Sequence, residues 1–229
     1  MLLLAINTAG PDCAVALARS GAGGGEILAQ ESERIGRGHA ERLMPTIEDL
    51  LSEAGVAFAD LDRIVVTTGP GSFTGVRVGI AAARGLALAL DIRCVGVNSL
   101  EALALPVSRQ EHTGTVVAAL DAKRGEVYLL ARDLASHHTQ IEATALHVEG
   151  VADRLRQAIR PLFVTGSGAP IVADALGGAE VAVLETAESP AIEDVAMLGL
   201  GAEGHSPPTP LYLRGADAKP QGDKVVALQ

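Results

Sequence analysis

The feature that most constrains the fold is a glycine-rich turn between an apolar run and a helix of small residues. Residues 67–85 are T-T-G-P-G-S-F-T-G-V-R-V-G-I-A-A-A-R-G. The apolar run at 63–68 predicts a buried strand, a helix should cover about 75–90, and 93–97 predicts the next strand. Strands joined through a helix pair in parallel with a right-handed crossover. This segment therefore predicts an α/β fold.

The preceding elements extend this unit into a mixed sheet. Apolar runs at 2–6, 13–18 and 26–31 are separated by short turns, which is typical of antiparallel strands. A helical pattern near 39–54 completes the order βββαβαβ within the first hundred residues. Because Pro45 lies inside that pattern, the helix should either begin near it or bend there.

The second half contains a similar set of elements, which suggests two related subdomains. Expected there are a helix at 99–105 capped by Ser99, strands at 115–120 and 126–131 joined by D-A-K-R-G, a helix at 151–159, strands at 162–165 and 180–184, and a helix that begins with Pro190. We therefore expect two βββαβα-type subdomains with mixed sheets, 1–100 and 101–204, and a tail, 205–229, that packs back on the first.

Composition and charge limit the class of protein. The chain has 229 residues, of which 48 % are hydrophobic and only 2 % aromatic, so Ala, Val, Leu and Ile must build its core. The formal net charge is −10 and neither half is basic, which argues against tight, direct binding to nucleic acid. Cys13 and Cys94 lie in apolar runs and predict buried thiols. The N-terminus has no basic segment of a signal peptide and no apolar run approaches the ~20 residues of a membrane span, so we expect a cytoplasmic protein without membrane contact.

The glycine loop admits two interpretations. It lacks the lysine of a G-x-x-x-x-G-K-[ST] phosphate loop, the glycine order of a dinucleotide fold and the G-x-S-x-G elbow of a serine nucleophile. Free amides at a helix N-terminus favour an anion, whereas Gly-Pro-Gly also suits a sharp turn, which we favour. The residues of the nucleotide or anion alternative are Asn7, Thr8, Gly69, Gly71, Ser72, Phe73, Thr74 and Gly75.

The helix after the loop is apolar or small nearly all round. Gly75, Gly79, Ala82 and Ala83 recur at three- and four-residue spacing, which leaves one face almost bare of side chains. Such a helix is buried on more than one side. Burial against its own sheet would explain one face, and we interpret the bare face as a contact with another chain.

The remaining polar candidates favour structural roles. The six histidines show no paired metal spacing, and His39 stands alone on its helical pattern. Asp121 ends an apolar strand, where it could be a catalytic carboxylate, but an Asx residue that opens the hairpin is the better interpretation. Asn7 occupies a strand end where a carboxylate would hold Mg²⁺, and an amide cannot supply that charge. No metal site is predicted.

Five sequence blocks resemble those of the TsaB (YeaZ) family in the same order along nearly the whole chain. They are L-A-I-N-T at 4–8, where the family has L-A-I-D-T, H-A-E-R-L-M-P at 39–45, G-P-G-S-F-T-G-V-R-V-G at 69–79, D-A-K-R-G-E-V-Y at 121–128 and P-L-Y-L-R at 210–214. The resemblance implies an actin-like, Hsp70-like ATPase fold with two ribonuclease H-like subdomains. It also makes Asp121, Gly125, Glu126, Tyr212 and Arg214 family-motif residues.

The resemblance further implies a non-catalytic scaffolding subunit in the synthesis of threonylcarbamoyladenosine (t6A) in tRNA. Such subunits partner the transferase TsaD and the ATPase TsaE, form homodimers when alone, and meet tRNA only indirectly. No cofactor of its own is required, although ATP at a complex interface is possible. The catalytic relative carries two histidines one turn apart on its first helix, whereas Arg42 and Leu43 follow His39 here.

In the family the first two helices dock on the equivalent helices of the partner. The residues expected there are His39, Arg42, Leu43, Met44, Ile47, Val76, Arg77, Ile80, Ala81 and Arg84. Two rival hypotheses are an ATP-hydrolysing enzyme with Asn7, Ser72 and Thr74 around the phosphates, and a peptidase that uses Ser72.

Overall fold

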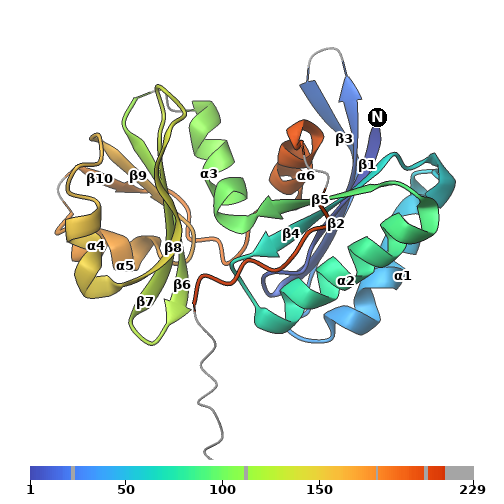
Figure 1. Ribbon diagram of the computed structural model, residues 1–229, viewed down its shortest axis with the longest axis horizontal. Helices are drawn as coiled ribbons and strands as arrows, with labels where there is room; N and C mark the ends of the chain where they lie inside the picture. Colours follow the sequence, from blue (N-terminus) through green and yellow to red (C-terminus); the bar gives the residue numbers. More distant parts are fainter. Residues whose placement is uncertain (22–23, 111–112, 179, 204–205, 215–229) are drawn as a thin grey trace, which may run out of the picture.

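The structure, a computed structural model, describes residues 1–21, 24–110, 113–178, 180–203 and 206–214 (Figure 1). Within these residues the chain forms two five-stranded sheets. Six α-helices lie between the sheets or on their outer faces, and a short 3-10 helix, Phe58–Asp60, precedes the fourth strand.

The first sheet has the mixed topology that the sequence predicts. Its order is β3-β2-β1-β4-β5; β1, β2 and β3 are antiparallel, while β4 and β5 continue in parallel from β1. Because β1 is the central strand and is covered on both faces, its apolar run is buried almost throughout. The strands are β1 Leu2–Asn7, β2 Asp12–Gly21, β3 Gly24–Arg34, β4 Arg63–Gly69 and β5 Arg93–Asn98.

The second sheet repeats this arrangement. Its order is β10-β9-β6-β7-β8, with β6, β7 and β8 antiparallel and β9 and β10 parallel to β6. Two α/β units of one topology therefore follow each other, as the actin-like fold class requires. The strands are β6 Thr115–Lys123, β7 Glu126–Asp133, β8 Thr139–His147, β9 Leu162–Thr165 and β10 Val181–Val183. The strand β8 was not predicted from the sequence.

The helices form three layers, one between the two sheets and one on the outer face of each sheet (Figure 1). Two lie on the outer face of the first sheet, namely α1 (His39–Glu53) and α2 (Phe73–Leu90), and α1 runs through Pro45 rather than beginning there. Two shorter helices, α4 (Val148–Arg154) and α5 (Ala169–Ala175), cover the outer face of the second sheet. Between the sheets lie α3 (Ser99–Gln110) and α6 (Ile192–Gly201).

The helix α6 packs on the first sheet although it comes from the second half of the chain. Val195 and Ala196 are buried with Leu3, Ala5 and Val65 in one apolar cluster. Arg63, at the start of β4, donates from Nη1 to the carbonyl oxygens of Gly199 (2.7 Å) and Ala202 (3.1 Å), which satisfies the C-terminal end of the helix. The division expected at residues 100 and 204 therefore does not hold, because 192–201 belong to the first lobe. Here a lobe means one sheet with its covering helices.

Two predicted helix starts also differ from the structure. The backbone N–H of Leu100 is capped by the Asn98 side chain (2.8 Å), so Asn98 rather than Ser99 caps α3. The last helix begins at Ile192 after Ala191, not at Pro190. In both cases the shift is one or two residues, which sequence patterns do not resolve.

The helix α2 corrects the expectation that no segment of the chain approaches the length and apolar character of a membrane span. Among the described residues it is the one helix that is long and apolar enough to cross a membrane by length and composition. Its buried residues, however, pack on β1 and β4, and it contains Arg77 and Arg84. One such helix, packed in this way, is weak evidence for a membrane span.

Candidate functional site

The glycine loop is fastened to the turn between β1 and β2. The backbone N–H of Ser72 donates to the carbonyl oxygen of Ala9 (2.7 Å), and a Cβ at Gly71 would lie 2.3 Å from that oxygen. The Ser72 hydroxyl accepts from the backbone N–H of Gly75 (3.2 Å) and caps α2. Two of the amides that could meet an anion are thus already bonded within the chain, and Ser72 serves as a helix cap rather than as a nucleophile.

The equivalent loop of the second lobe is fastened in the same way. The backbone N–H of Gly168 donates to the carbonyl oxygen of Ala119 (3.0 Å), and a Cβ at Gly166 would lie 2.2 Å from that oxygen. Both strand-to-helix loops therefore bond to the first segment of their own lobe: one to Ala9, in the turn after β1, and the other to Ala119, within β6. This common geometry supports the turn interpretation of the glycine loop.

The small face of α2 lies against β1. A Cβ at Gly75 would meet the carbonyl oxygen of Thr8 at 2.0 Å, and one at Gly79 would meet the Thr8 hydroxyl at 2.4 Å. The Thr8 hydroxyl donates to the carbonyl oxygen of Gly75 (2.8 Å), and Ala83 is fully buried. The interpretation of this bare face as a contact with another chain is therefore wrong. The glycines are needed because the helix lies directly on Thr8, the residue that follows β1.

Asn7 is a structural residue that lines a cleft between the two lobes. Its Nδ2 donates to the carbonyl oxygen of Pro190 (2.8 Å), and its Oδ1 accepts from the Thr67 hydroxyl (3.0 Å) and the backbone N–H of Ala9 (3.1 Å). The side chain is almost fully buried. An amide can donate to Pro190, which an ionised carboxylate cannot, so this environment explains the asparagine.

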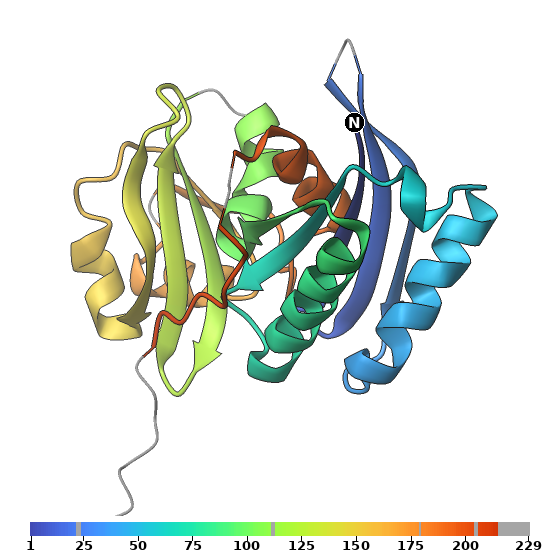
Figure 2. The ribbon, with the colours of Figure 1, turned by 45° about the vertical axis from the view of Figure 1, so that its right-hand side comes forward.

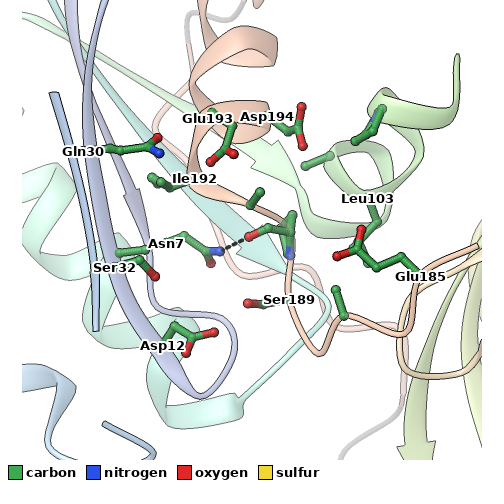
Figure 3. Close-up of a pocket in the computed structure, with 16 residues that line it drawn as sticks. Asn7, Asp12, Gln30, Ser32, Leu103, Glu185, Ser189, Ile192, Glu193 and Asp194 are labelled. Carbon is green, nitrogen blue, oxygen red and sulfur yellow. Dashed lines mark hydrogen bonds between the residues drawn. The ribbon is translucent and has the colours of Figure 1, made fainter. Parts of the chain in front are cut away.

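A cavity of about 330 Å³ lies between the lobes (Figure 3). Strands β1, β2 and β3, helices α3 and α6 and the segment 185–191 line it. Of the eight residues predicted for a nucleotide or anion, only Asn7 lines this cavity. Gly69, Gly71, Ser72, Phe73, Thr74 and Gly75 lie in or directly after the β4–α2 turn, outside the cavity lining, and Thr8 bonds to α2.

The cavity is acidic. Asp12, Glu185, Glu193 and Asp194 line it, and no lysine or arginine is among the lining residues that the structure describes. Burial raises the pKa of Asp194 to about 6, although Arg109 at 3.5 Å acts in the opposite direction. In the described parts of the chain no group of three or more His, Cys, Asp or Glu residues is placed to hold a metal ion.

This cavity does not fit the ATP that the fold class implies. Four carboxylates would repel a triphosphate, and in the neighbouring glycine loop the Ser72 amide is bonded to Ala9 and the Gly75 amide to the Ser72 hydroxyl. Magnesium would need carboxylates that converge on one point, and the described residues show no such group.

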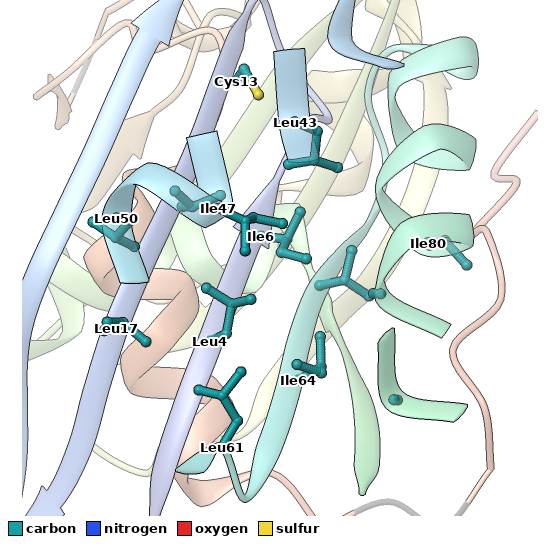
Figure 4. Close-up of a cluster of buried hydrophobic side chains, with 14 of the residues drawn as sticks. Leu4, Ile6, Cys13, Leu17, Leu43, Ile47, Leu50, Leu61, Ile64 and Ile80 are labelled. Atoms are coloured by element: carbon teal, nitrogen blue, oxygen red, sulfur yellow. The ribbon is translucent and has the colours of Figure 1, made fainter. Parts of the chain in front are cut away.

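Half of the predicted partner-contact residues belong to the core of the first lobe. Leu43, Ile47, Val76 and Ile80 are at most 5 % exposed, and Figure 4 shows Leu43, Ile47 and Ile80 in one cluster with strand side chains. His39 is also buried, and its Nε2 has no hydrogen-bond partner among the described residues. These five side chains cannot be a partner's first contact, so that part of the prediction is wrong.

The other half lies on or near the surface. Arg77, Ala81 and Arg84 are exposed on α2, while Arg42 and Met44 are half-buried on α1. Arg42 forms an ion pair with Glu33 on β3 (2.6 Å). The sequence analysis missed Leu88, whose side chain is 85 % exposed. It follows Ala81 and Gly85 on the same helical face, so extending that series by one turn would have found it.

The family-motif residues organise the β6–β7 hairpin and the segment that crosses it. Asp121 accepts from the backbone N–H (2.8 Å) and Nζ (2.7 Å) of Lys123, as an Asx turn requires, and the Lys123 hydrogen bond lowers the pKa of Asp121. Gly125 supplies the positive φ of 77° in the turn. Glu126 pairs with Arg214 and faces His147. Asp121 is thus a turn residue, which agrees with the structural interpretation.

Tyr212 joins an exposed cluster at the start of α2. The Arg77 guanidinium lies 3.5 Å from the centre of the Phe73 ring and donates from Nε to the Tyr212 hydroxyl (2.9 Å). The Phe73 and Tyr212 rings are 5.9 Å apart, and both are more than half exposed. Two of the chain's five aromatic side chains therefore meet on the surface.

Comparison with known proteins identifies the family. Residues 27–164 match the family model described as TsaD: tRNA N6-adenosine threonylcarbamoyltransferase. The TsaB protein of Escherichia coli, named for tRNA threonylcarbamoyladenosine biosynthesis, is 33 % identical over 225 residues, which cover 93 % of this chain and 95 % of that protein. The chain belongs to the TsaB (YeaZ) family. TsaB of Bacillus subtilis is 38 % identical over 128 residues, 56 % of this chain and 53 % of that protein.

Solved structures of the family have the same fold. YeaZ from Pseudomonas aeruginosa superimposes with a TM-score of 0.69 at 30 % identity and covers 93 % of this chain and 99 % of its own. A protein with similarity to peptidase YeaZ from the same organism gives a TM-score of 0.74 at 32 % identity with the same coverage. The TsaB resemblance and the two-sheet fold predicted from the sequence are thus confirmed.

Proposed function

We propose that this TsaB-family chain is an accessory subunit of t6A synthesis in tRNA, and that it acts by binding TsaD rather than by catalysis. Its relatives are named for this biosynthesis, and part of the chain matches the family model of the transferase itself. The cleft is acidic, and the amides of Ser72 and Gly168 in the strand-to-helix loops are bonded within the chain, which favours a binding role over nucleotide chemistry. A chain with the fold of an enzyme can pair with that enzyme through equivalent surfaces. TsaE joins the complex in this proposal, tRNA is met only through the partners, and the protein is cytoplasmic.

The observation on which the proposal rests is the exposed face of α2. Ala81, Gly85 and Leu88 form an apolar strip on it, with Arg77 and Arg84 alongside. A partner surface that covered Leu88, which is 85 % exposed, would gain about 1.5–3 kcal/mol from burial of this leucine side chain. We propose that α2 meets TsaD there, or a second copy of this chain when TsaD is absent.

The proposal is tested by co-expression with TsaD and sizing of the complex. Leu88→Glu and Ala81→Arg should each weaken the complex by about 2 kcal/mol or more, roughly 30-fold, while the thermal transition of the variant alone is unchanged. Leu184→Glu is the matched control, because Leu184 is an exposed leucine on the second lobe. If both α2 variants bind TsaD as the wild type does, the surface is wrongly assigned.

The rival nucleotide hydrolase is tested separately. Calorimetry of the isolated protein with ATP and Mg²⁺ should show no tight binding, because the cleft carboxylates repel the phosphates. Tight binding together with turnover of ATP would overturn the accessory role. A nucleotide held only at the joint surface with TsaD remains compatible with the proposal.

A further inference from the structure

The last described segment, residues 206–214, crosses from the first lobe to the second (Figure 2). On the first lobe, Pro208 is buried against Gly96 on β5. A Cβ added at Gly96 would lie 3.1 Å from the Cβ of Pro208. The backbone N–H of Leu211 donates to the carbonyl oxygen of Thr68 on β4 (2.8 Å). Tyr212 is held by Arg77 on α2 (2.9 Å).

On the second lobe the same segment has its own anchors. Leu213 packs against the apolar cluster formed by α3, β6 and β7. The Arg214 guanidinium donates to the carbonyl oxygen of Ala122 (3.0 Å) and pairs with Glu126. It also lies 6.0 Å from the centre of the Tyr128 ring. Arg214 thus fixes the segment to the β6–β7 hairpin by three kinds of contact.

The two sets of anchors are close together in the chain, and this limits how far the lobes can separate. Tyr212 is bonded to the first lobe and Arg214 to the second, and two residues of extended chain span at most about 7 Å. The lobes therefore cannot separate at this point unless one anchor is released. Two side-chain ion pairs also lie at the cleft, and they are weak ties because the side chains of Arg109 and Arg34 are more than half exposed.

We propose that residues 206–214 form a strap that fixes the separation of the two lobes and hence the width of the acidic cleft. Parts of one chain that each have their own sheet and core move relative to each other by default, unless their interface is large and apolar. The strap suppresses this motion by tying α2 and β4 of one lobe to the β6–β7 hairpin of the other.

The test measures the separation of the lobes directly. Spin labels at Ser32→Cys on β3 and Gln110→Cys at the end of α3, in a Cys94→Ala background, report the distance across the cleft by pulsed electron paramagnetic resonance. Arg214→Ala and Tyr212→Ala should each broaden this distance distribution toward longer values. Lys123→Ala is the control, because its ion pair with Asp121 stays within the hairpin.

Hydrogen exchange separates a strap from a segment that merely rests on one lobe. In Tyr212→Ala the amide of Leu211 should exchange about ten-fold faster, because the first-lobe anchor next to it is lost. In Arg214→Ala the cleft should widen while that amide stays protected by Thr68. If neither variant changes the distance distribution relative to Lys123→Ala, the strap does not hold the lobes and the proposal is wrong.

Discussion

Replacing Gly75 by alanine tests whether α2 lies on β1 through its glycines. The added Cβ would sit 2.0 Å from the Thr8 carbonyl oxygen and 3.2 Å from the Ser72 hydroxyl, and the first distance requires backbone movement. The same substitution at Gly85, ten residues later in the same helix, meets no atom within 4 Å. The two variants make one chemical change in one helix, in its first turn at Gly75 and in its interior at Gly85, and differ chiefly in what the new methyl group contacts.

The expected magnitudes have opposite signs. Alanine is more favourable than glycine in a helix interior by about 1 kcal/mol, so Gly85→Ala should stabilise the fold by up to that amount. At Gly75 this gain is opposed by overpacking of ~1–3 kcal/mol. The Thr8 hydrogen bond to the Gly75 carbonyl is also disturbed, at a cost of ~1 kcal/mol. Gly75→Ala should therefore lower the free energy of unfolding by about 1–3 kcal/mol.

Urea unfolding followed by far-ultraviolet circular dichroism measures both variants. The chain has no tryptophan, so this signal is better suited than fluorescence. Protein concentration must be equal throughout, because any self-association contributes to the apparent stability. If Gly75→Ala unfolds at the same or a higher urea concentration than Gly85→Ala with equal m-values, the close contact of α2 with β1 is refuted.

Two further predictions concern the cleft. Asn7→Asp should lower the free energy of unfolding at pH 7 by about 1–3 kcal/mol, because a carboxylate replaces the amide donor to Pro190. The same variant should not bind ATP in calorimetry. Unchanged stability would contradict the hydrogen bonds assigned to Asn7. Asp194 has a folded-state pKa of about 6 against an ordinary value of 3.8, so the native protein binds more protons than the unfolded chain between these values and loses stability as the pH rises through them. Asp194→Asn should therefore add about 1–2 kcal/mol at pH 7, after allowance for solvent screening in the cleft, and nothing below about pH 4 in urea titrations; a gain that does not depend on pH would exclude this cause.

The sequence predicted the order of elements in the first lobe and the mixed character of its sheet because these signals are local. Apolar runs, short polar turns and a strand–helix–strand unit leave few topologies open. The strand β8, Thr139–His147, was missed because its alternation is weak and its residues are mostly half-buried. The placement of α6 was also missed, since no local pattern states which sheet a helix will cover.

The candidate site was harder to predict, because α2 is apolar nearly all round. Periodicity can show that such a helix is buried, but not which face meets its own sheet. Gly75 and Gly79 face Thr8, so the surface that we propose for the partner is the opposite, exposed strip with Leu88. The acidic cleft combines Asp12 with Glu185, Glu193 and Asp194, which lie far apart in the chain and meet only after folding.

The position of α6 has a consequence for synthesis on the ribosome. All strands of the first sheet have been synthesised by Asn98. Gly199 on α6, which packs against Val65 on the inner face of that sheet, follows about a hundred residues after Asn98. At about 5–20 residues per second, that apolar face waits several seconds for its cover. The N-terminal half should consequently emerge as an unfinished layer, and the nascent chain should acquire its native resistance to protease only after residue 201 has left the exit tunnel.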